Sequence, residues 1–105
     1  MEEPNLSVIN TLSGGDKTFE EKIFNVIKRE FPEEKDQYFD NLKNENLTKA
    51  AEDVHKLKHK ISILGLEKSY EIATDYEKNL KQGTFGLKED FEKILQTITQ
   101  YITTL

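Results

Sequence analysis

Residues 47–64, LTKAAEDVHKLKHKISIL, have the pattern that most clearly predicts the fold of this chain. Apolar residues recur in this stretch at intervals of three and four, the period of an α-helix with one buried face. These apolar residues are Leu47, Ala50, Ala51, Val54, Leu57, Ile61 and Leu64. Gly65 follows directly, and glycine commonly ends a helix in the left-handed conformation. The stretch therefore predicts an amphipathic helix over 47–64.

Similar spacing on both sides of this segment predicts an all-α chain. We expect a short helix over 5–12, a long helix over 16–43, and two further helices over 66–82 and 87–105. No segment alternates apolar and polar residues as a half-buried strand would. Because the connections between the long helices are short, successive helices should be antiparallel. The predicted fold is an antiparallel up-down four-helix bundle with a short N-terminal helix.

Two residues decide the course of the long helix over 16–43. Asp16 is a suitable N-cap, since its side chain can accept hydrogen bonds from the first free backbone amides. Pro32 either bends one long helix or begins a second, because proline fits the first position of a helix. We expect a single helix that continues, bent, to about Lys43.

Composition and charge restrict the class of protein. The 105 residues are 35% hydrophobic and 33% charged, which suits one solvated domain over 1–105. There is no cysteine, and the net charge of -5 argues against general binding to nucleic acid or anionic membranes. No signal peptide is evident and no apolar run is long enough to span a bilayer, so we expect a cytoplasmic protein. Segment 47–64 differs from the rest, because its four lysines and two acidic residues give it a net charge of +2.

His55 lies at the edge of the apolar stripe of segment 47–64. It falls about 100° from Val54 on the helical wheel, just outside the stripe. Its neighbours on the wheel are Thr48, Ala51 and Ser62, which are small, so the ring should stand at the edge of a groove. On position alone, an ordinary surface histidine is the commoner explanation.

Lys58 follows His55 by one helical turn. Its ammonium should keep the ring neutral and nucleophilic by like-charge repulsion, and it could also stabilise a phosphoryl group attached to the ring.

Other chemistry has weaker support in the sequence. His55 and His59 have the i, i+4 spacing of zinc-binding helices, but the glutamate of the HExxH motif is missing and two lysines lie between them. Two surface histidines are therefore the preferred interpretation. The glycine pairs lack the lysine and serine of a phosphate-binding loop. Tyr70 and Tyr76 have the spacing of core residues.

At these residues the chain resembles the histidine-containing phosphotransfer (HPt) family, over nearly its whole length. The family signature is a histidine with lysine at +3 and usually glycine at +4, a glycine about ten residues on, and a Leu-Glu pair near the end of the next helix. Here His55, Lys58 and Gly65 match, and Tyr76-Glu77 takes the place of Leu-Glu. Upstream, the short helix, the turn at 14–16 and the Phe31-Pro32 step also fit the family.

Two residues depart from the family pattern. In the family, the glycine at +4 leaves room for a partner beside the phosphorylated ring, and here His59 replaces it. Val54 replaces a common alanine before the histidine. His59 could crowd the docking surface, select the partner or act as a rival acceptor.

The resemblance implies a phosphorelay intermediate of two-component signal transduction. His55 would accept a phosphoryl group at Nε2 from the aspartate of a receiver domain and pass it to another receiver, with Lys58 as electrostatic support. Such a protein is a carrier, not an enzyme, and it needs no cofactor, nucleotide or metal site of its own; Mg²⁺ belongs to the partner receiver. The expected partners are response-regulator receivers and a hybrid sensor kinase. Docking contacts are expected from Thr48, Ala51, Glu52, Lys56, His59 and Ser62.

Two alternatives stay open at this level. One is an HPt-like binding module that docks receivers or kinases without transferring phosphate, and the other is a helical protein-interaction scaffold. The start at Met1 and the end shortly after the last helix suggest a free-standing, monomeric carrier, although a domain of a larger kinase would look the same.

Overall fold

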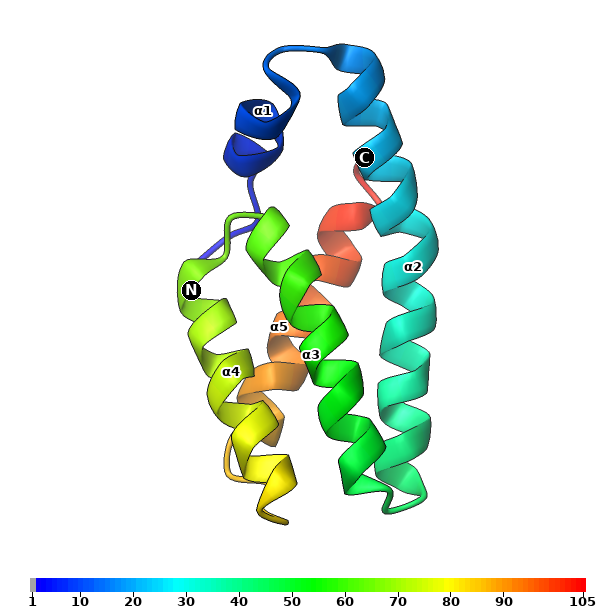
Figure 1. Cartoon of the computed structure of the whole chain (residues 1–105), viewed down its shortest axis with the longest axis vertical. Helices are drawn as coiled ribbons and strands as arrows, with labels where there is room; N and C mark the ends of the chain where they lie inside the picture. Colours follow the sequence, from blue (N-terminus) through cyan, green and yellow to red (C-terminus); the bar gives the residue numbers. More distant parts are fainter. Residues whose placement is uncertain (1) are drawn as a thin grey trace.

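The computed structural model describes residues 2–105, in which all regular secondary structure is helical. The five helices are α1 (Ser7–Ser13), α2 (Lys17–Lys43), α3 (Leu47–Ile63), α4 (Glu67–Lys81) and α5 (Lys88–Ile102). The four longer helices lie lengthwise in a molecule of 43 × 23 × 19 Å, and α1 lies at one end (Figure 1). The chain is all-α, as predicted.

The helix ends follow local hydrogen bonding. Asp16 is the N-cap of α2, as predicted, and its Oδ1 accepts from the amides of Thr18 at 2.9 Å and Phe19 at 3.2 Å. Helix α2 continues through Pro32 to Lys43, so the prediction of one helix rather than two is confirmed.

Helix α5 ends at Ile102, three residues before the predicted end. The hydroxyls of Thr103 and Thr104 donate to the carbonyls of Gln100 and Tyr101, at 2.6 and 2.7 Å. Threonine side chains that bond to the backbone in this way compete with the regular helical pattern, which explains the early end.

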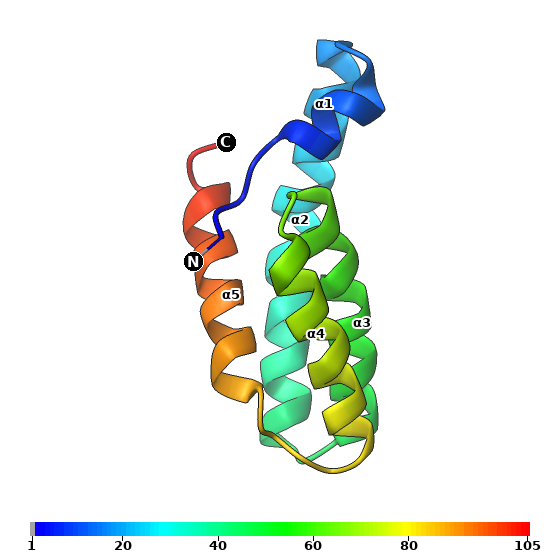
Figure 2. The ribbon, with the colours of Figure 1, turned by 90° about the vertical axis from the view of Figure 1, so that its left-hand side faces the viewer.

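Helix α3 is the central element of the fold. It packs against α2 on one side and α4 on the other (Figure 1), and α5 contacts both α2 and α4 (Figure 2). The predicted apolar stripe of α3 is buried, except that Leu47 at its start is only half-buried. With neighbours on two sides, α3 exposes only a narrow strip of side chains.

An aromatic cluster joins α2, α4 and α5. The rings of Tyr38, Tyr76 and Phe91 have centroids 5.1 to 6.2 Å apart. The hydroxyls of Tyr38 and Tyr76 are hydrogen-bonded at 2.6 Å, and the Tyr38 hydroxyl also donates to Glu92 Oε2 at 3.1 Å. Burial, together with these partners, raises the pKa of Tyr38 far above its ordinary value, so the hydroxyl remains a donor. Because Tyr76 must face this cluster, the rotation of α4 about its axis is determined.

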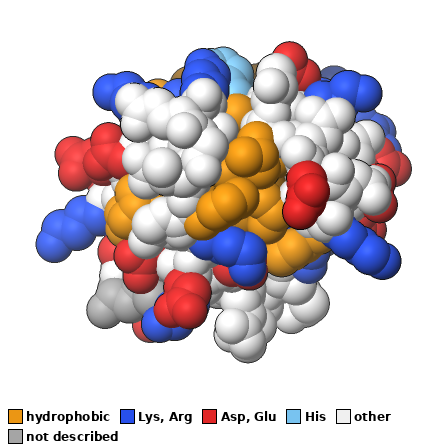
Figure 3. All heavy atoms as spheres, turned by 90° about the horizontal axis from the view of Figure 1, so that it is seen from below, with side chains coloured by type: hydrophobic (Ala, Val, Ile, Leu, Met, Phe, Trp, Pro, Cys, Tyr) orange, Lys and Arg blue, Asp and Glu red, His pale blue; other side chains and the backbone are white. Residues whose placement is uncertain are grey.

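Some apolar residues of the α2 pattern are exposed. Phe19, Val26 and Phe39 are 44, 38 and 41% exposed, although they belong to the same helical period as the buried Ile27 and Phe31. Helix α2 has 27 residues and α3 has 17, and a short turn over 44–46 joins them, so the N-terminal part of α2, which includes Phe19, extends past α3. Phe39 lies instead near the joined ends, in a hollow lined by residues of α2 and α5. Hydrophobic side chains also reach the surface at the end of the molecule opposite α1 (Figure 3).

The segment before α1 is attached to the turn between α3 and α4. The amide of Asn5 donates to the carbonyl of Leu64 at 2.8 Å, and the Asn5 side chain lies against Gly65. Gly65 has φ +77°, in the left-handed region that favours glycine, as predicted for the end of this helix. The carboxylate of Glu2 accepts from the amides of Lys68 and Ser69, at 3.1 and 2.8 Å, and so caps α4.

Gly65→Ala should destabilise the protein more than Gly83→Ala. Both glycines have positive φ, +77° and +80°, and an alanine there costs about 1 kcal/mol in backbone strain alone. A Cβ on residue 83 would have nothing within 4 Å, whereas a Cβ on residue 65 would lie 2.5 Å from Asn5 Oδ1. We expect losses in the free energy of unfolding of about 1 kcal/mol for Gly83→Ala and at least about 2 kcal/mol for Gly65→Ala, measured by chemical denaturation. Equal losses would show that the attachment of Asn5 contributes nothing.

Candidate functional site

His55 lies on the exposed edge of α3, where the helical wheel places it. Its side chain is 53% exposed, while the residue before it, Val54, is completely buried. The backbone of His55 is therefore held next to the packed core, while its imidazole ring remains accessible from outside.

Glu77, which projects from α4, holds one nitrogen of this ring. His55 Nδ1 lies 3.2 Å from Glu77 Oε1. Because an ionised carboxylate only accepts hydrogen bonds, Nδ1 carries the hydrogen, and a neutral ring then has its lone pair on Nε2. Among the described residues only Nδ1 of the two ring nitrogens has a hydrogen-bond partner. The contact therefore selects Nε2 as the nucleophilic nitrogen.

Two lysines also contact the Glu77 carboxylate. Lys58 Nζ donates to Oε1 at 3.2 Å, and Lys81 Nζ lies 3.2 Å from Oε2. Partial burial of Glu77 disfavours the ionised form, but the hydrogen bonds from Lys58, Lys81 and His55 outweigh it and lower the pKa of Glu77 below 4.5. Glu77 is thus anionic at neutral pH and accepts from three donors at once.

Lys58 is covered by the surrounding side chains rather than exposed next to the His55 ring. Only 11% of its side chain is exposed, and its Nζ lies 5.5 Å from the centre of the Tyr70 ring. A cation over an aromatic face is stabilised by the ring's electron distribution. Lys58 therefore acts on His55 through Glu77, because both groups contact the same carboxylate oxygen.

The net positive charge of segment 47–64 is largely neutralised by neighbouring helices. Besides Lys58, Lys60 is only 11% exposed, and its Nζ lies 3.0 Å from Glu30 Oε1 and 3.3 Å from Glu34 Oε1 on α2. The hydrogen bond from Lys60 lowers the pKa of Glu30. Two of the four lysines that made this segment appear basic are thus already paired, and the exposed surface around His55 is less positive than the sequence predicts.

The predicted docking residues fall into two groups. Thr48, Glu52, Lys56, His59 and Ser62 are exposed on α3. Ala51 is only 1% exposed, although it contributes to the wall of the pocket beside His55.

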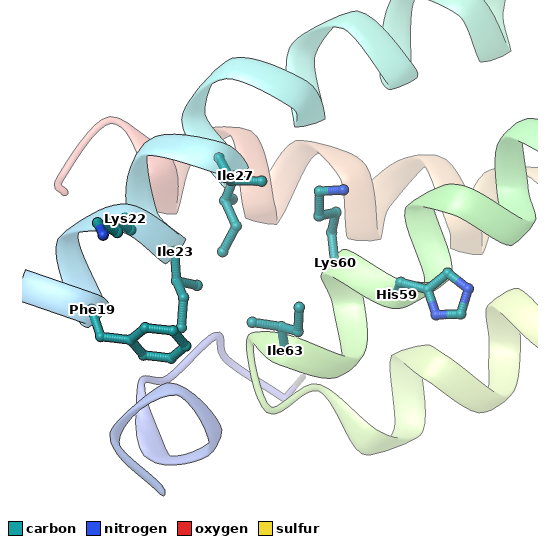
Figure 4. A pocket seen from close by; sticks show the side chains of 8 residues that line it. Phe19, Lys22, Ile23, Ile27, His59, Lys60 and Ile63 are labelled. Atoms are coloured by element: carbon teal, nitrogen blue, oxygen red, sulfur yellow. The ribbon is translucent and has the colours of Figure 1, made fainter. Parts of the chain in front are cut away.

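His59 is the immediate neighbour of the candidate acceptor. Its ring meets the His55 ring edge-on, with centroids 5.0 Å apart and planes at 89°. His59 also borders an apolar groove of about 320 Å³ between α2 and α3, into which Phe19, Ile23 and Ile63 project (Figure 4). His59 thus lies between His55 and this groove.

Glu77 and Lys81 are the site residues that sequence reasoning did not identify. Tyr76-Glu77 occupies the position of the Leu-Glu pair, but a shared position in a motif does not reveal that the carboxylate contacts a histidine 22 residues earlier. The rotation of α4 that brings them together depends on Tyr76 in the core.

Comparisons of the chain with protein-family models, curated proteins and solved structures give no match. Within residues 2–105, no three histidine or acidic side chains gather as metal ligands, and none of the helices is both long and apolar enough to cross a membrane.

Glu77→Gln should lower stability in a pH-dependent manner. The pKa of Glu77 is lower in the folded protein than its ordinary 4.5, so the carboxylate stabilises the fold above about pH 4.5 and this contribution is lost as the pH falls through the folded-state pKa. At pH 7 the variant should lose about 1 to 3 kcal/mol of unfolding free energy, because the covered Lys58 ammonium loses its counter-charge. Chemical denaturation at several pH values should show this deficit shrinking below pH 4.5. The matched control is Glu71→Gln, at an exposed position of the same helix; a deficit independent of pH would contradict the assignment.

Proposed function

We propose that this chain is a phosphorelay intermediate of the HPt type, which accepts a phosphoryl group on His55 from a receiver-domain aspartate and passes it to another receiver. The observation that carries the proposal is the 3.2 Å contact between His55 Nδ1 and Glu77 Oε1, which leaves Nε2 of an exposed ring available. In this proposal the four longer helices form the antiparallel up-down bundle of that family, and the protein works in the cytoplasm.

The chemistry of the transfer suits this arrangement. The lone pair of Nε2 attacks the phosphorus of the aspartyl phosphate, the N–P bond forms, and the P–O bond breaks with its electrons returning to the aspartate carboxylate. No proton has to leave Nε2, because the hydrogen is on Nδ1. The positive charge that develops on the ring is stabilised by Glu77, while the partner receiver supplies Mg²⁺ and its own lysine. Positioning and charge compensation are what phosphoryl transfer requires.

A receiver would dock over the surface that includes His55, His59 and the apolar groove beside them. Phe19 and Val26 offer exposed apolar area there, and the exposed residues of α3 offer polar contacts at the rim. Interfaces commonly combine such an apolar centre with a polar rim. Because two lysines of α3 are paired, apolar contact would contribute more to docking than electrostatic attraction.

One observation favours a second candidate, an HPt-like module that binds without transfer. The edge-on contact between His59 and His55 places a second ring where the family pattern has glycine. If His59 blocks in-line approach to Nε2, the protein would dock a receiver and carry no phosphate.

Incubation with a phosphorylated receiver and Mg²⁺ should label the chain with phosphate that is acid-labile and base-stable, as expected for phosphohistidine. The label should disappear in His55→Gln and persist in His59→Ala, because only His55 has the Glu77 contact. Label retained after replacement of His55 would refute the assignment of the acceptor. Binding without label in the natural chain, with label gained in His59→Gly, would support the second candidate.

Lys58→Ala should reduce the transfer rate about tenfold, the effect of one lost hydrogen bond to a charged group. The reason is that Glu77 loses its covered donor and positions the His55 ring less firmly. Rapid-quench measurement of phosphoryl transfer tests this, and Lys49→Ala, at an exposed lysine of the same helix outside the predicted docking residues, is the matched control. Equal rates in the two variants would remove the role of Lys58.

A further inference from the structure

A pocket of about 400 Å³ lies directly beside His55. It is lined by side chains of α3 and α4, namely Ala51, Glu52, His55, Lys56, Glu77 and Lys81. A group attached to Nε2 of His55 would be close to this pocket, since the ring forms part of its wall. The charged side chains that line the pocket would therefore influence how strongly a phosphoryl group on His55 is stabilised.

Lys58 is poorly placed to contact such a group. Its side chain is 11% exposed and its Nζ is already held between Glu77 Oε1 and the Tyr70 ring. To reach the solvent side, this covered ammonium would have to give up both its ion pair with Glu77 and its contact with the Tyr70 ring, which is costly.

Lys81 is placed differently. It is the last residue of α4, its side chain is 62% exposed, and its Nζ contacts the other oxygen of the same carboxylate, Oε2, at 3.2 Å. Exposed ion pairs of this kind are weak, so the ammonium can leave at little cost. Glu77 would then keep two of its three partners, Lys58 and His55. Of the two lysines bonded to Glu77, Lys81 is thus the exposed one, and its release breaks only a weak ion pair.

We propose that the pocket beside His55 is a phosphoryl-binding site in which Lys81 is the mobile cation: its Nζ moves from Glu77 Oε2 to an oxygen of the phosphoryl group when Nε2 is phosphorylated. This inference rests on the proposed function. Lys81 Nζ and His55 Nδ1 contact the two oxygens of the same carboxylate, each at 3.2 Å. Because Nε2 lies on the other side of the ring from Nδ1, the Lys81 side chain would extend past Glu77 along the ring to reach the phosphoryl group. Attraction between the ammonium and a doubly charged phosphoryl group exceeds its attraction to a carboxylate that is already bonded to two other donors.

Lys58 and Lys81 have different roles in this proposal because they contact different oxygens of Glu77. Oε1 binds the buried Lys58 and the acceptor ring in both states, so the orientation of His55 is kept. Oε2 loses Lys81 only while the phosphoryl group is present. The pocket would therefore distinguish the phosphorylated from the free ring by the position of one side chain.

Phosphoramidate, a chemical donor that phosphorylates histidine without a protein partner, makes this testable. With His55 phosphorylated, ³¹P NMR follows the titration of the phosphoryl group in the natural chain and in Lys81→Gln. A cation nearby favours the doubly charged form, so its loss should move the titration midpoint upward by roughly half a pH unit, about a threefold change in the ionisation constant. Lys81→Arg should restore the midpoint, because it keeps the charge.

The control variant is Lys78→Gln, an exposed lysine one turn earlier on α4 that does not line the pocket. It should leave the midpoint unchanged. An unchanged midpoint in Lys81→Gln, or a shift in Lys56→Gln instead, would overturn the role of Lys81 while transfer from a receiver remains intact. Absence of phosphate on His55 in the natural chain would instead refute the proposed function itself.

Discussion

Helix α3 carries two lysines whose side chains are almost completely covered, and a covered ammonium is tolerated only beside a carboxylate. The neighbouring helices meet this requirement from both sides, with Glu77 from α4 and Glu30 and Glu34 from α2. These pairs restrict how each neighbour can rotate and slide against α3. The arrangement of the candidate site follows from the same restriction, because the carboxylate that pairs with Lys58 is also the one that orients His55.

Pairing also changes the electrostatics of the surface. Counted along the chain, segment 47–64 carries a net charge of +2, but two of its four lysines are engaged with acidic residues of other helices. Long-range attraction of an acidic partner therefore depends on the lysines that remain exposed, such as Lys56 and Lys81. Close contact can depend instead on the apolar groove near His59, where exposed phenylalanine and valine side chains favour burial.

His55, Glu77 and the two lysines form one charge-balanced group rather than a histidine with a single supporting lysine. Oε1 of the Glu77 carboxylate is bonded to the covered Lys58, and Oε2 is bonded to the exposed Lys81. In the proposed carrier role, this arrangement would present the same ring in the free and the phosphorylated states. His59, in edge-on contact with the acceptor ring, is the feature that any docking partner has to accommodate.

Local sequence was enough to predict the helical class, the single continuous α2, the cap at Asp16, the glycine after α3 and the exposure of His55. These features depend on residues close together in the chain, through helical period, capping and the conformational preference of glycine. The contacts of Lys58 and Lys81 with the Glu77 carboxylate depend instead on how the helices pack. Helical wheels place side chains around one axis but not the rotation of one helix against another, and that rotation depends on the packing of core residues such as Tyr76. The charges that surround His55 come from two helices, and their meeting is a property of that packing.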